Sequence, residues 1–195
     1  ALQQGQQSFS MPLLLDEVFS GSVATSESSA LTFAATGDSI ANLFKAGVSY
    51  YAEIVSGSAA GHRVESDETT STADSIALDL DSPLSTLHSA PALAAGTRVV
   101  VRPHQTAVGI FGSDLLASTD NAATADRLLF FEAGAYRVLW LRATESGPTW
   151  TWETGENATD AGQRIISPVD GLLIDLRGGA LTLPVVGQVR TTAYV

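Results

Sequence analysis

Apolar and polar residues alternate in the first part of the chain, just after a glutamine-rich start. From residue 8 to residue 15 every second position is apolar, and most positions between are small or polar. This period of two is that of a β-strand with one buried face. Pro12 has no amide hydrogen to donate, so we expect the strand to lie at the edge of a sheet. The apolar positions are Phe9, Met11, Leu13 and Leu15.

Further short apolar or alternating segments follow along the whole chain, separated by turn-forming residues. They predict strands at residues 18–25, 30–35, 50–55, 62–65, 75–80, 98–102, 128–131, 136–143, 149–153, 172–176 and 181–195. The only helical structure expected is a turn within the loop at residues 81–96 and a short turn within residues 105–112. About a dozen short strands with little helix predict an all-β fold, an antiparallel β-sandwich or barrel.

One hairpin can be predicted in register. If a two-residue turn near Glu145 and Ser146 joins the strands on either side, Leu139 and Leu141 share a face with Trp150 and Trp152. The two indoles of this face could form a platform for stacking sugars, but the pairing with leucines favours a hydrophobic core. The opposite face then carries Trp140 and Arg142.

Trp140 and Arg142 are the predicted surface aromatic patch. Trp and Arg are enriched at the centres of binding interfaces, so this pair could contact a sugar or another subunit. Tyr50 or Tyr136 could extend the patch. A half-buried position within the sheet is the alternative for Trp140.

The charge balance excludes some partners. The 195 residues include 21 acidic and 10 basic ones, which gives a net charge of -11, so a nucleic-acid backbone would be repelled. No apolar run approaches the roughly 18 residues that a membrane-spanning helix needs. We expect no nucleic-acid partner and no membrane insertion. The chain also has no cysteine and one lysine, Lys45, and its many Ser and Thr residues favour an extracellular or cell-surface location.

No catalytic or metal-binding motif stands out. His62, His88 and His104 lack the spacing of a zinc site. Acidic pairs such as Asp79 and Asp81 are more typical of solvated turns than of a calcium loop. The sequence contains neither a G-x-S-x-G motif nor a P-loop. We therefore expect no catalytic residue, no metal, no cofactor and no enzymatic activity. Asn157 begins an N-glycosylation acceptor pattern.

Several strand and turn motifs, spread over most of the chain, are similar to those of a known group of proteins. They include Gln7-Ser8-Phe9-Ser10-Met11-Pro12, Tyr50-Tyr51-Ala52-Glu53-Ile54, Val101-Arg102-Pro103-His104 and Ala125-Asp126-Arg127-Leu128-Leu129-Phe130. With them the chain resembles an uncharacterised family of secreted, β-rich bacterial proteins. The resemblance implies secretion and an all-β fold, and it transfers no site residue.

The expected function follows from the ends of the chain. We expect residues 1–15 to form an N-terminal extension or strand that is available to a neighbouring subunit, and residues 16–195 to form a single β-rich domain. Unpaired strand edges favour pairing with another copy. The hypothesis is a secreted structural protein that self-assembles through β-strand addition into a filament, a pilus-like fibre or a surface layer. Its expected interface anchors are Phe9, Met11, Leu13 and Leu15, and its partners are further copies of itself. The alternative is a monomeric carbohydrate-binding or adhesive surface domain with glycans as partners.

Overall fold

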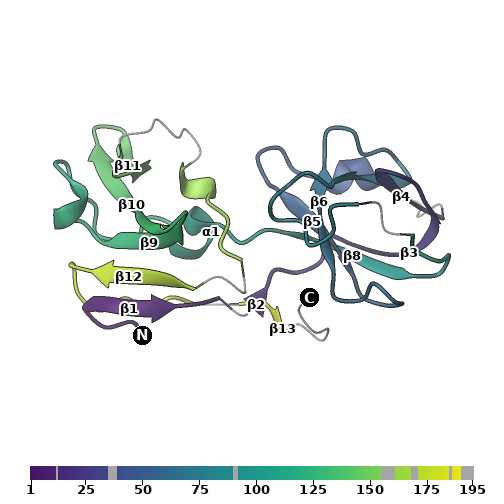
Figure 1. The fold of residues 1–195 in the computed structure, drawn as a ribbon. Helices are drawn as coiled ribbons and strands as arrows, with labels where there is room; N and C mark the ends of the chain where they lie inside the picture. Colours follow the sequence, from purple (N-terminus) through teal and green to yellow (C-terminus); the bar gives the residue numbers. More distant parts are fainter. Residues whose placement is uncertain are drawn as a thin grey trace. The chain divides into compact units, whose positions relative to one another are not determined.

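The computed structural model describes residues 1–11, 13–34, 39–89, 92–154, 161–167, 171–184 and 186–189 (Figure 1). These residues form two compact units. One consists of Ala1–Leu13 and the chain from Gln105 to Val186, and the other consists of Leu14–His104 and the described residues from Gly187 on. The fold is all-β, as the sequence predicts, and it contains a closed barrel and a five-stranded sheet.

The barrel lies in the second unit and has six antiparallel strands. Around it the strands follow the order β3 (Phe19–Ser26), β4 (Ala30–Phe33), β7 (Ser75–Asp79), β6 (Arg63–Asp67), β5 (Tyr50–Ile54) and β8 (Arg98–Pro103). A 3-10 helix, η1 (Ile40–Leu43), lies between β4 and β5 along the sequence. Alternate residues of each strand point inward, which builds a core of aliphatic and aromatic side chains such as Val23, Leu31, Ile54, Ile76 and Val99.

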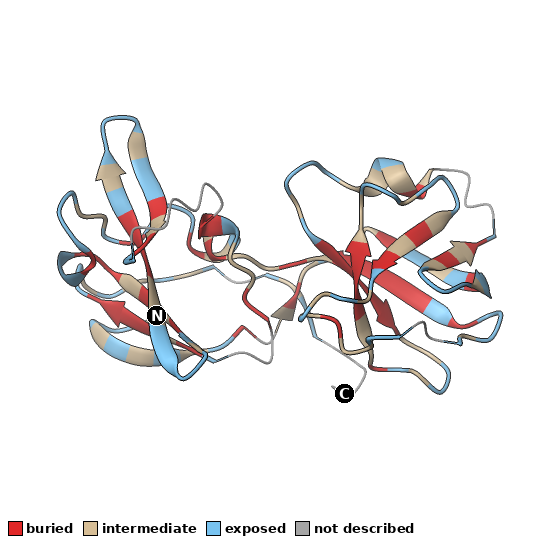
Figure 2. Ribbon diagram, turned by 45° about the horizontal axis from the view of Figure 1, so that its top comes forward, coloured by how far each residue is buried: buried red, intermediate tan, exposed pale blue. Residues whose placement is uncertain are grey.

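The five-stranded sheet lies in the first unit. Its strands follow the order β1 (Gly5–Phe9), β12 (Leu172–Leu176), β9 (Arg127–Glu132), β10 (Ala135–Thr144) and β11 (Gly147–Trp152). Every neighbouring pair is antiparallel. One face packs with α1 (Ala107–Phe111) and η3 (Ala161–Gln163) into a second core, whose buried side chains include Phe111, Leu139, Leu141, Trp150 and Trp152. Figure 2 shows buried positions gathered on the strands of both units.

Most of the predicted strands are confirmed within a few residues at each end. The hairpin register is confirmed too, since Leu139 lies opposite Trp152 and Leu141 opposite Trp150. The predicted first strand is divided, because β1 ends at Phe9 and the next strand, β2 (Leu13–Leu14), forms a two-stranded sheet with β13 (Gln188–Val189). The edge position predicted for Pro12, the glycosylation pattern at Asn157 and the strand predicted to continue to Val195 lie outside the described residues.

The chain passes from one unit to the other between Leu13 and Leu14 and again between His104 and Gln105. The predicted division into an extension of residues 1–15 and a domain of residues 16–195 stays a prediction. The sequence does not show the two units because β1, from the start of the chain, pairs with β12, which follows more than 160 residues later.

Candidate functional site

The exposed edge of the five-stranded sheet at β1 is the candidate site. β1 is the first strand in the sheet order and pairs on one side with β12, from Gly5 opposite Leu176 to Phe9 opposite Leu172 (Figure 1). Among the described residues no strand pairs with its other side. The first charged residue of the chain is Asp16, so this edge carries no side-chain charge.

Local contacts hold the segment before β1. The side-chain amide of Gln7 donates to the carbonyl of Gln3, and its oxygen accepts from the amide of Gln3 at 3.2 Å. Leu2 and Leu181 exchange two backbone hydrogen bonds of 2.7 and 2.9 Å. The side chain of Gln4 also donates to the carbonyl of Arg177. The glutamine-rich start is thereby tied to the sheet by its own amides.

The four predicted interface anchors have different surroundings. Phe9 is half-buried, and its ring lies 5.5 Å from that of Phe111. Met11 is 2% exposed and belongs to the core of the sheet. Leu13 and Leu15 are half-buried, and the carbonyl of Leu15 accepts from Arg102 at 2.8 Å. Phe9 and Met11 therefore already pack within their own chain, which leaves the backbone edge of β1 as the part open to a partner.

The other edge of the sheet, β11, has features that oppose strand pairing. Pro148 lies within the strand and has no amide hydrogen. Acidic residues flank the strand at Glu145 and Glu153. Proline and charge are the devices that natural proteins use to protect edge strands. The two edges of one sheet therefore differ, and β1 is the unprotected one.

A charged row lies next to β1 on the face away from the core. Asp175 of β12 pairs in register with Gln6 on one side and with Arg127 on the other. Its carboxylate accepts from Arg127 and, at 2.7 Å, from Arg177. Burial would raise the pKa of Asp175, but the hydrogen bonds from the two guanidinium groups outweigh it, so the pKa lies below its usual value.

The predicted surface patch is wrong in one of its two residues. Trp140 is 5% exposed and packs against Ala122 and Ala125, at the two ends of η2 (Ala122–Thr124). The sequence prediction failed because this helical turn covers the face of the sheet that the strand pattern left open. Arg142 is exposed, as expected of a surface residue, but without Trp140 it forms no aromatic patch.

An exposed aromatic pair lies elsewhere on the sheet and was not predicted. Phe131 of β9 and Tyr136 of β10 face each other in register, are 64% and 53% exposed, and lie with ring centroids 5.2 Å apart. They flank the turn at Ala133 and Gly134. The sequence pattern placed Tyr136 only as an extension of the patch at Trp140. The sequence does not reveal the register between β9 and β10, which brings Phe131 opposite Tyr136.

The barrel carries buried ionic groups on its outer face. The guanidinium of Arg102 lies 3.7 Å from Glu53 and 3.6 Å from Glu17. Nε2 of His104 lies 2.7 Å from Glu65, and its ring lies 4.8 Å from that of Tyr51. The charge of Arg102 is balanced by carboxylates, and Glu65 has a hydrogen-bonding partner in His104, as buried polar groups require.

The three histidines do not form a site together. His104 pairs with Glu65, whereas Nδ1 of His62 lies 3.2 Å from Thr86 and that of His88 lies 3.1 Å from the carbonyl of Leu80. Within the described ranges no group of three or more His, Asp or Glu side chains is placed to hold a metal ion.

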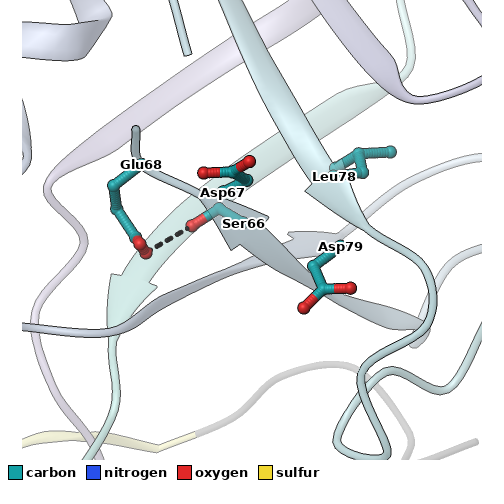
Figure 3. A pocket seen from close by; sticks show the side chains of 5 residues that line it. All are labelled: Ser66, Asp67, Glu68, Leu78 and Asp79. Carbon is teal, nitrogen blue, oxygen red and sulfur yellow. Dashed lines mark hydrogen bonds between the residues drawn. The ribbon is translucent and has the colours of Figure 1, made fainter. Parts of the chain in front are cut away.

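An open pocket of about 320 Å³ on the barrel is lined by Ser66, Asp67, Glu68, Leu78 and Asp79 (Figure 3). Its carboxylates are engaged locally. Hydrogen bonds from the hydroxyls of Thr69 and Thr70 lower the pKa of Asp67. Glu68 accepts from Ser66 and, at 2.9 Å, from the amide of Tyr50 on β5, and Asp79 accepts from the backbone that follows it. Asp67 and Asp79 thus fix the turns after β6 and β7, Glu68 ties its turn to β5, and the three carboxylates leave no converging set of ligand atoms.

Comparison with known proteins gives no guide to activity: no family model, no curated protein and no solved structure matches the chain. The resemblance to secreted bacterial β-proteins therefore stays a prediction. Among the helices that the structure describes, none combines the length and the apolar character needed to span a membrane.

Proposed function

We propose that this is a secreted structural protein whose copies assemble by adding strands at the free edge of β1. The observation that carries the proposal is the contrast between the two edges of one sheet. β1 has neither a charge nor a proline within Gly5–Phe9, whereas β11 carries Pro148 between two glutamates. An edge that lacks such protection pairs readily with another chain.

The net charge of the chain supports the choice of this edge. Copies with a charge of -11 repel one another over most of their surface, and contact is least unfavourable where charge is absent. Residues 1–15 carry no ionisable side chain. Strand addition draws its affinity from main-chain hydrogen bonds, so a stretch of Gln, Ser and Gly suffices for it. A filament or a surface layer outside the cell is the setting that we propose.

The test is to place charge on the edge without touching the core. Gln6 and Ser8 are exposed, so the double variant Gln6→Lys with Ser8→Lys keeps the fold and opposes strand addition. We expect the native protein to form assemblies larger than a monomer in electron micrographs and in size-exclusion chromatography, and the variant to elute as a monomer of 20.3 kDa.

The matched control adds the same two charges elsewhere on the same unit, by Ser113→Lys with Ala123→Lys, both exposed. The control should assemble like the native protein. A native protein that is monomeric at all concentrations, or an edge variant that assembles as well as the control, would contradict the proposal.

A second candidate function is glycan binding, and the pair Phe131 and Tyr136 favours it. Exposed aromatic rings on a hairpin can stack against sugar rings. A glycan array should then give specific binding that the variant Phe131→Ser with Tyr136→Ser abolishes. Binding that survives in this variant, or no binding to any glycan, would remove this candidate.

A further inference from the structure

We infer that the contact at β1 is symmetric: β1 of one copy pairs antiparallel with β1 of a second copy, centred on Gln7. The inference rests on the proposed function, since it specifies how two copies meet at that edge. The result is one continuous sheet across two chains, related by a two-fold axis perpendicular to the sheet.

The direction of the strands carries the argument. Four antiparallel steps separate β1 from β11, so the two edge strands of the sheet run in the same direction. A copy added by simple translation would therefore place β11 beside β1 in parallel, the slightly less stable pairing. Rotating that copy by a half-turn about an axis in the plane of the sheet and perpendicular to the strands makes the pairing antiparallel. The same rotation exchanges the two faces of the sheet, so the hydrophobic core of the second copy lies on the opposite side.

A two-fold axis perpendicular to the sheet avoids both difficulties. It makes the two β1 strands antiparallel and keeps both cores on the same side. The same operation at β11 would bring Pro148 and the flanking glutamates of two copies together. β1 carries no such obstacle, so the symmetric contact falls there.

The sequence of β1 also fits its own antiparallel copy. Full overlap of the five residues places Gln7 opposite Gln7, Gln6 opposite Ser8 and Gly5 opposite Phe9. The space where Gly5 would carry a Cβ is open, with no atom within 4 Å. Gly5 has a positive φ of 103° and no side chain, so it adds no steric obstacle opposite Phe9, whose ring packs against Phe111 of its own chain. Gln6 and Ser8 pair as polar side chains on the outer face.

A five-residue strand contact is small compared with the roughly 1,200–2,000 Å² that stable interfaces bury. We therefore expect a weak pair that a covalent bond can trap. Symmetric pairing also closes at two copies, so a filament needs a second contact elsewhere, and the repeating unit of the assembly is a pair of chains.

Cysteine cross-linking tests the register, because the chain has no cysteine of its own. Residues directly opposite on antiparallel strands are close enough for a disulfide. Under mild oxidation we expect Gln7→Cys to form a covalent dimer and nothing larger. A mixture of Gln6→Cys and Ser8→Cys chains should cross-link more than either variant alone. The control Ser113→Cys, exposed in a loop of the same unit, should stay monomeric.

The alternatives give different outcomes. If Gln7→Cys does not cross-link by itself but the double variant Gln6→Cys with Thr149→Cys, both on the outer face of the sheet, forms a ladder of oligomers, β1 meets β11 head to tail. That result would overturn the symmetric pairing and leave the proposed function standing. If no variant cross-links beyond the control and the native protein stays monomeric, both the inference and the proposed function fail.

Discussion

At the scale of single residues, burial decides which side chains have a structural role. Trp150 and Trp152 were predicted in the core because leucines lie opposite them, and the structure confirms this. Trp140 could not be placed in the same way, since the side chains that cover it, Ala122 and Ala125, belong to a separate turn. Strand periodicity shows which residues share a face, but not what covers that face.

Asp175 gives a prediction about pH. The folded protein lowers the pKa of Asp175 below the value of about 3.9 in an unfolded chain, so its ion pairs stabilise the fold fully above that value. This stability is lost as the pH falls through the lower, folded pKa. At neutral pH we expect Asp175→Asn to reduce the free energy of unfolding by about 1–3 kcal/mol.

The measurement is denaturant unfolding followed by tryptophan fluorescence between neutral and acidic pH. The difference between native protein and Asp175→Asn should shrink in acid. The exposed Asp114, replaced by Asn, serves as a control with little effect at any pH. An equal difference between native protein and Asp175→Asn at every pH would contradict this role.

At the scale of elements, the positions of the strands along the chain were easier to predict than which strands pair with one another in a sheet. Alternation located nearly all strands, and Pro103 ends β8 as expected. The N-terminal pattern suggested one strand where the structure has β1 and β2, because Met11 turns into the core between them. The pairing of β1 with β12 is a long-range contact that no local pattern contains.

The turn between β9 and β10 supports an element-scale prediction. Ala133 and Gly134 are its two central residues, and both have positive φ angles, 49° and 83°. This geometry favours Asn-Gly and costs energy for alanine. We expect Ala133→Asn to raise the free energy of unfolding by roughly 0.5–1 kcal/mol.

Thermal unfolding measures this effect. The control is Ser146→Asn, in the two-residue turn between β10 and β11, where Ser146 has no positive φ angle. The control should give no gain in melting temperature. Equal changes in both variants would show that the backbone of Ala133 does not determine the effect.

At the scale of the whole molecule, the all-β architecture could be predicted, but its division into two units could not. Short strands and many turns identify the class. A barrel in one unit and an open sheet in the other depend on which strands pair, and most of those choices join distant parts of the chain. The candidate site shows the same limit: the sequence indicated the N-terminal strand, whereas its position at an unprotected edge emerges from the sheet order.

The central claim is that β1 pairs with another copy, and amide hydrogen exchange tests it directly. We would measure exchange in peptides that cover residues 1–11 at low and high protein concentration, with peptides of β11 as the internal reference. Strand addition protects the outward amides of β1 when copies meet, so exchange across Gly5–Phe9 should slow as concentration rises while β11 stays unchanged. Exchange in β1 that is the same at every concentration would contradict the account.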